Sequence, residues 1–165
     1  MKVRLSMMLA AGAVALAATP AHAQSRANCQ RVTPQQVEAQ FDRFNAAWAT
    51  RNPDQVTQLF ARDAVLLPTV SNTPRTDHAG IRDYFVTFLR GEPVGQINTS
   101  TVSIGCNMAS RVGTWTVRLK DQATGRTNDV RARYSFIYRW EGGQWRIAHL
   151  HSSMMPETAP QTAGR

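Results

Sequence analysis

The stretch from Asp129 to Glu157 constrains the fold more than any other part of the chain. Its first half, Arg131 to Trp140, alternates in character with a period of two, which is typical of a β-strand whose two faces have different surroundings. Gly142 and Gly143 follow, and paired glycines can adopt the positive φ angles of a tight hairpin turn. A second alternating run begins at Trp145. The sequence therefore predicts a β-hairpin here.

Alternation also assigns the side chains of this hairpin to faces. In the first strand, one face is aromatic and the other carries arginine, with Ala132, Tyr134, Phe136 and Tyr138 on the former and Arg131, Arg133, Ser135 and Ile137 on the latter. In the second strand, the predicted shared face holds Trp145, Ile147, His149 and His151. If the register allows, Arg133 joins the two imidazoles on one concave face, where these groups would favour an anion.

Three amphipathic helices are predicted before the long strands. Their cap signals are Thr33 with Gln36 in a capping box, Asn52, and either Asp77 or Thr76. The first and third helices have large apolar faces. Strands are expected at 64–67, 97–106 and 111–120. Helices followed by long antiparallel strands predict an α+β domain, with the helices packed on one face of a bent sheet.

The N-terminal segment has the pattern of an export signal. Lys2 and Arg4 precede an apolar run, and Ala21-His22-Ala23 is a small-x-small site of the kind that signal peptidase accepts. The apolar run is shorter than the ~20 residues of a membrane-spanning helix. We therefore expect a signal peptide at 1–23, a single domain at 24–157 and a disordered tail at 158–165. The mature protein is expected in the periplasm or secreted, without membrane association.

The formal net charge of +8 comes mostly from arginines that are spread along the chain. Because no lysine-rich run is present, nucleic-acid binding is not expected. Export would place the chain in an oxidising compartment, where Cys29 and Cys106 can form a disulfide. Two buried thiols are the alternative, since the sequence does not give the distance between the two Cα atoms.

Several segments together resemble a known superfamily. They are RNPD at 51–54, LFARDA at 59–64, GIRDYF at 80–85 and QWRIAHLHSS at 144–153. The combination resembles the nuclear-transport-factor-2-like superfamily, which includes the SnoaL-like polyketide cyclases, over nearly all of the mature chain. The ending is similar to the association (hub) domain of calcium/calmodulin-dependent protein kinase II and its stand-alone bacterial relatives.

This resemblance implies a cone-shaped fold, in which a strongly bent antiparallel sheet wraps around N-terminal helices and leaves a pocket at its open end. It also implies self-association through the sheet, as a dimer or a larger ring. In the hub family, matching arginine and histidine positions line a pocket for small carboxylates. Arg133, His149 and His151 are therefore the residues expected to bind a carboxylate, and Tyr84 and Trp115 are expected to form the walls of the pocket. No cofactor is implied.

Other roles for these residues stay open. Arg133 can instead form an ion pair with Asp129, His149 can be a core histidine bonded to backbone, and His151 can be exposed at the strand end. A lyase, isomerase or cyclase that uses His149 or His151 as its base is the rival function, and a purely structural oligomerisation module is the third. A metal site is not expected, because no third ligand accompanies the two histidines.

Overall fold

The structure is a computed structural model that describes residues 29–156. The predicted signal peptide at 1–23 and tail at 158–165 lie outside the described residues, as do the outermost parts of the predicted domain 24–157. The helical elements are α1 (Pro34–Ala49), α2 (Pro53–Thr57), α3 (His78–Phe88) and the short 3-10 helix η1 (Leu89–Gly91). The strands are β1 (Phe60–Leu67), β2 (Val94–Gly105), β3 (Met108–Lys120), β4 (Thr127–Glu141) and β5 (Gln144–Met154).

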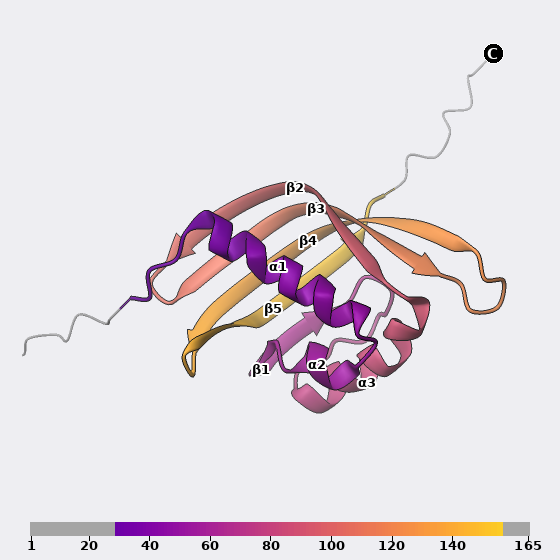
Figure 1. The fold of residues 1–165 in the computed structure, drawn as a ribbon, viewed down its shortest axis with the longest axis horizontal. Coiled ribbons are helices and arrows are strands. Elements are labelled where there is room, and N and C mark those ends of the chain that lie inside the picture. Colours follow the sequence, from indigo (N-terminus) through magenta and orange to yellow (C-terminus); the bar gives the residue numbers. More distant parts are fainter. Residues whose placement is uncertain (1–28, 157–165) are drawn as a thin grey trace, which may run out of the picture.

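The strands form a five-stranded sheet in the order β1-β5-β4-β3-β2 (Figure 1). The strands from β2 to β5 are antiparallel to their neighbours, whereas β1 pairs with β5 in parallel. The predicted α+β class is therefore confirmed, with a sheet that is mixed because of β1. Gly142 and Gly143 have positive φ angles of 57° and 79°, so the predicted hairpin between β4 and β5 is also confirmed.

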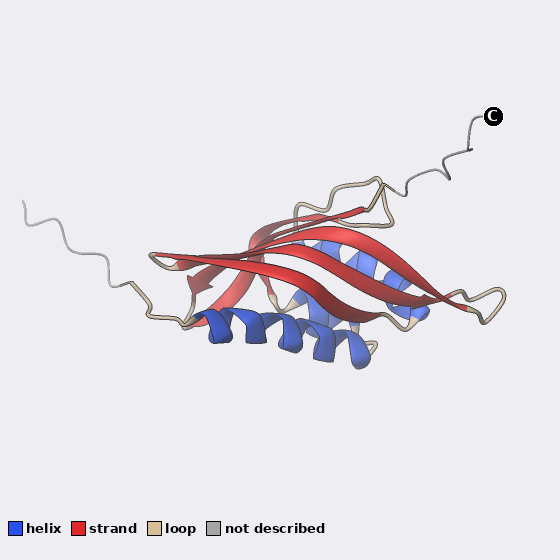
Figure 2. Cartoon of the chain, turned by 90° about the horizontal axis from the view of Figure 1, so that it is seen from above, coloured by secondary structure: helices blue, strands red, loops and turns tan. Residues whose placement is uncertain are grey.

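The helix α1 lies along one face of the bent sheet (Figure 2). Its start is the predicted capping box, because the Thr33 hydroxyl accepts the Gln36 amide and the Gln36 side chain accepts the Thr33 amide. Phe44 is fully buried on the sheet side, and its ring centroid lies 6.2 Å from that of Phe85 in α3 and 5.4 Å from that of Phe136 in β4. One aromatic core thus joins both helices to the sheet.

The helix α3 closes the other side of the concave face. Of the two predicted caps, Asp77 is the one used, since its Oδ1 accepts the Gly80 amide at 2.7 Å. Ile81, Tyr84 and Phe85 are its buried residues. No helix within residues 29–156 is long and apolar enough to cross a membrane.

Register shifts interrupt three of the strand pairings. The shift between Ile97 and Thr99 brings the Thr99 carbonyl oxygen against β3, where a Cβ at Gly113 would lie only 2.0 Å from it. Only glycine fits there without moving the backbone. Such irregularities bend a strand and increase its local twist, which suits the curvature of this sheet around α1.

Cys29 and Cys106 form a disulfide, with their Cα atoms 4.7 Å apart. The bond attaches the segment before α1 to the turn between β2 and β3, where the Gln30 amide also donates to Asn107 Oδ1 at 2.7 Å. Because the bonded cysteines are 77 residues apart, the loss of unfolded-chain entropy stabilises the fold by about 4 kcal/mol.

Candidate functional site

A cavity opens between α1, α3 and the concave face of the sheet. Its lining consists mostly of aromatic and aliphatic side chains, three of the residues carry a hydroxyl, and the full set is Phe44, Trp48, Leu66, Pro68, Thr69, Val70, Tyr84, Phe85, Phe88, Trp115, Val117, Leu119, Val130, Leu150 and Ser152. The cavity volume is about 20 Å³, roughly the room that one water molecule needs. A larger guest therefore requires some of these side chains to move apart.

The polar groups of the cavity meet at Ser152 on β5. Its Oγ accepts a hydrogen bond from Trp115 Nε1 at 3.0 Å and another from the Thr69 hydroxyl. Ser152 is buried at 5% exposure and Trp115 at 3%, so bulk solvent does not reach either group. A buried donor without an acceptor is costly, and Ser152 therefore holds the Trp115 indole in one orientation.

Both residues predicted as pocket walls, Tyr84 and Trp115, line the cavity. The Tyr84 ring stacks on Phe88 with centroids 5.2 Å apart, and the Arg75 guanidinium carbon lies 5.9 Å from its centroid. Burial raises the pKa of the Tyr84 phenol, so this side chain is uncharged at physiological pH. Tyr84 and Trp115 thus lie in the cavity wall as predicted, and their role in ligand binding stays a prediction.

A β-bulge in β5 changes the expected faces of that strand. Tyr138 of β4 pairs with Ile147, but the preceding residue of β4, Ile137, pairs with His149. Ala148 is therefore an extra residue without a partner. An extra residue in one strand reverses its alternation beyond that point.

The prediction that His149 and His151 share a face with Trp145 is consequently wrong. Beyond the bulge, the buried positions of β5 are Leu150 and Ser152, whereas His149 is half-buried and His151 exposed. Both imidazoles lie on the face of the sheet that is turned away from α1. Uninterrupted alternation would have placed Leu150 and Ser152 on that face instead.

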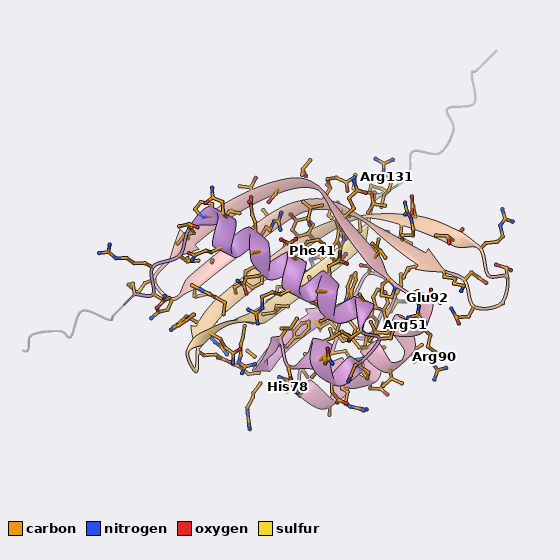
Figure 3. The ribbon with its side chains drawn as sticks, in the orientation of Figure 1. Phe41, Arg51, His78, Arg90, Glu92 and Arg131 are labelled. Atoms are coloured by element: carbon orange, nitrogen blue, oxygen red, sulfur yellow. A yellow bond between two sulfur atoms is a disulfide. The ribbon has the colours of Figure 1, made fainter. Side chains whose placement is uncertain are left out.

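Arg133 lies on the same side of the sheet as the two histidines, and it is exposed. Figure 3 shows its neighbour at the next alternate position, Arg131, extending away from the body of the protein. The alternative ion pair of Arg133 is not formed, because Asp129 binds Arg118 at 3.2 Å and Arg133 Nη2 instead donates to the Met154 carbonyl oxygen at 3.4 Å. The prediction that Arg133, His149 and His151 meet on the concave face is therefore wrong, since none of the three side chains lines the cavity. Carboxylate binding by them stays a prediction.

We call the side of the sheet turned away from α1 the outer face. On this face, Val65 and Leu67 of the edge strand β1 pair with His149 and His151 of β5. Further into the sheet, Ile137 of β4 pairs with His149, and Val112 of β3 pairs with Ser135 of β4. Burial lowers the pKa of His149, and the nearby His151 lowers it further. The helices described within residues 29–156 pack on the opposite side (Figure 2).

Of the groups that general acid–base catalysis uses, the described lining of the cavity contains only the Tyr84 phenol. Its lining, as far as the described residues form it, has no Asp, Glu, His, Lys or Arg. Within residues 29–156, no three His, Cys, Asp or Glu side chains gather where they could hold a metal ion. The rival function with His149 or His151 as the base therefore finds no support in the position of these two residues.

Sequence reasoning missed Thr69, Ser152 and Trp48 as cavity residues. Ser152 was assigned to the opposite face because the alternation was continued through Ala148. Thr69 follows β1 in a loop, and only the parallel pairing of β1 with β5 brings it to Ser152. A local sequence pattern does not carry that information.

The fold is that of the nuclear transport factor 2-like class. A protein of this superfamily from Salmonella enterica aligns with a TM-score of 0.66 at 16% identity, covering 79% of this chain and 96% of the other. A ketosteroid isomerase-like protein from Erwinia carotovora aligns with a TM-score of 0.61 at 15% identity, covering 72% and 93%. Similarities at this level of identity establish the fold only.

The chain belongs to the calcium/calmodulin dependent protein kinase II association domain family, which matches residues 33–156. A solved structure described as such an association domain, from Xanthomonas campestris, is 42% identical, with a TM-score of 0.72 and coverage of 79% of this chain and 97% of the other. No curated protein matches the chain. The resemblance seen in the sequence is thereby confirmed at the level of the family.

The hydrogen bond between Trp115 and Ser152 leads to a stability prediction. Ser152→Ala leaves the Trp115 indole N–H and the Thr69 hydroxyl without their acceptor, so we expect the free energy of unfolding to fall by about 1–3 kcal/mol. Ser153→Ala is the matched control, because Ser153 pairs with Arg133 on the outer face and should change stability by less than about 0.5 kcal/mol. Urea denaturation followed by fluorescence measures both. Equal losses in the two variants would contradict the role given to Ser152.

Proposed function

We propose that this chain is an exported, self-associating protein whose copies pack through the outer face, and that its cavity binds a small molecule. The observation that carries self-association is the presence of four apolar side chains, Val65, Leu67, Val112 and Ile137, on a sheet face that the described helices leave uncovered. The description of the family as an association domain supports the same reading.

The composition of the outer face suits an interface between proteins. Its apolar side chains are interspersed with short hydroxyl side chains of β2, β3 and β4, among them Thr101, Ser110 and Ser135. Interfaces between proteins commonly combine apolar side chains with polar groups that hydrogen-bond or stay hydrated. A standard interface buries about 800 Å² on each partner, an area for which a five-stranded sheet offers room.

Binding of a small molecule is the second part of the proposal. Aromatic walls with a few convergent polar groups are the usual make-up of a ligand site, and the cavity combines Tyr84, Phe88 and Trp115 with the hydroxyls of Thr69 and Ser152. Its small volume favours the competing view of a purely structural module. Ligand binding would decide between these alternatives.

Export is supported by the sequence of residues 1–23 and by the bond between Cys29 and Cys106, because structural disulfides are rare in reducing compartments. Expression of the full chain in a bacterial host with an export pathway should release a product that begins at Gln24. Intact-mass spectrometry of the periplasmic fraction before and after reduction measures both the cleavage and the disulfide. An uncleaved product confined to the cytoplasm would contradict export.

Two valines of nearly equal exposure allow a direct test of the outer face. Val112 on β3 is 39% exposed and Val86 on α3 is 37% exposed. Val112→Lys introduces a charge into the proposed interface, so we expect the oligomer to dissociate, with an equilibrium constant weakened at least tenfold. Val86→Lys should leave the oligomer intact. Size-exclusion chromatography with light scattering measures the mass of each. A monomeric wild type, or identical behaviour of both variants, would refute the proposed interface.

Self-association should weaken as the pH falls. Burial already lowers the pKa of His149 from its ordinary value of 6.5, and an interface would bury it further. The oligomer then binds fewer protons than its separate subunits, so association is fully favoured above the pKa of His149 in the separate subunits, which already lies below 6.5, and weakens as the pH falls through that pKa. Two carboxylates of the strands that flank β5, Asp63 of β1 and Glu141 of β4, are paired with Arg139. Light scattering at pH 7.5 and pH 5.5 should show the change, and His149→Gln with His151→Gln should abolish it. An unchanged pH dependence in that double variant would exclude the histidines as its cause.

A further inference from the structure

Trp48 carries a hydrogen-bond donor that has no acceptor. The side chain lines the cavity and is 3% exposed, and its Nε1 is buried without a hydrogen-bond partner. The other indole of the cavity, that of Trp115, has Ser152 as its acceptor. Since a buried N–H without a partner costs about 1–3 kcal/mol, an acceptor supplied by a guest would remove this cost.

The orientation of the Trp48 ring directs this donor away from β2. Its Cζ3 lies 3.5 Å from the position that a Cβ on Gly95 would occupy, so the six-membered ring faces β2. In an indole, Nε1 lies on the side opposite Cζ3. The rings that surround Trp48 are those of Phe44, Phe88 and Trp115, with centroids 4.7, 5.2 and 5.9 Å away, and all of them line the same cavity.

Ser152 offers a second donor to the cavity. Its oxygen accepts from both Trp115 and Thr69, and the hydroxyl has one proton of its own to donate. Because this proton is not used in either bond, the hydroxyl can donate to a guest. The Trp48 indole N–H and the proton of the Ser152 hydroxyl are thus two donors without an acceptor among lining residues that are mostly apolar, the other hydroxyls being those of Thr69 and Tyr84.

The cavity does not offer compensation for a charged guest. The described lining residues include no cationic side chain, and the guanidinium of Arg75 lies over the Tyr84 ring without being part of the lining. Moving a carboxylate from water into such surroundings without a paired charge is strongly unfavourable. Two neutral donors, by contrast, match the acceptor oxygen of an uncharged molecule.

We propose that the cavity binds a small uncharged molecule with a carbonyl or similar acceptor oxygen, which takes the hydrogen bonds of Trp48 Nε1 and the Ser152 hydroxyl. This inference rests on the proposed binding of a small molecule and adds the chemical class of the ligand. The apolar remainder of the ligand lies against Tyr84 and Phe88. It reaches solvent at Val70, which lines the cavity and is 49% exposed, and this residue moves aside as the ligand enters.

Three ring compounds of similar size test the proposal. They are cyclohexanone, cyclohexanecarboxylate at pH 7.5 and methylcyclohexane. Each is titrated into the full mature protein, with the indole N–H signals of its four tryptophans followed in proton–nitrogen NMR spectra. Trp48→Phe assigns the relevant signal. We expect cyclohexanone to shift the Trp48 signal in a saturable manner, and cyclohexanecarboxylate to leave it unchanged.

Ser152→Ala supplies an independent comparison. It should weaken the binding of cyclohexanone roughly tenfold, as is typical for the loss of one hydrogen bond, whereas Ser153→Ala should bind like the wild type. The wild-type spectra keep the proposal testable even if Ser152→Ala does not fold.

The possible results separate this inference from the function on which it rests. Binding of the carboxylate in the cavity, or equal binding of ketone and hydrocarbon without movement of the Trp48 signal, would overturn the ligand class and leave small-molecule binding standing. If none of the three compounds binds, both proposals for the cavity fail. Self-association is measured separately and does not depend on either result.

Discussion

The extra residue in β5, Ala148, decides which side chains of that strand build the interior. Before it, Trp145 and Ile147 face the helices. After it, Leu150 and Ser152 do so, because the bulge reverses the alternation. Without the bulge, imidazoles would replace a leucine and a hydroxyl against the aromatic core, where polar groups need partners that the surrounding rings do not provide. The contact between β5 and the helices therefore depends on this one interruption of the strand pairing.

The strand β5 contributes residues to the proposed ligand cavity from one face and to the proposed subunit interface from the other. Ser152 faces the cavity, whereas His149 and His151 face outward beside Val65 and Ile137. The sheet thus separates an uncharged, aromatic interior from a surface on which apolar, hydroxyl and ionisable side chains mix. A ligand that spreads the cavity would press on the backbone of β5, and that backbone also positions the residues of the proposed interface. The two functions are physically adjacent, although they share no side chain.

Local features of the sequence were sufficient to predict much of the fold. The capping box at Thr33 and the glycine turn between β4 and β5 involve residues close in sequence, and Tyr84 and Trp115 followed from the apolar faces of a helix and a strand. The parallel pairing of β1 with β5 joins distant segments and had no local signal. Ala148 was equally hidden, since neither glycine nor proline marks the bulge. Because this one extra residue has no sequence signal, the predicted site of Arg133, His149 and His151 was assigned to the wrong face of the sheet.

The disulfide makes part of the chain a covalent ring. Between Cys29 and Cys106, this ring contains all the described helices together with β1 and β2. If a protease cuts one peptide bond within it, both fragments stay attached to each other and to the remaining strands until the sulfur–sulfur bond is reduced. The helical layer then cannot diffuse away from the sheet, so a nicked molecule has a greatly increased chance of closing again over its aromatic core.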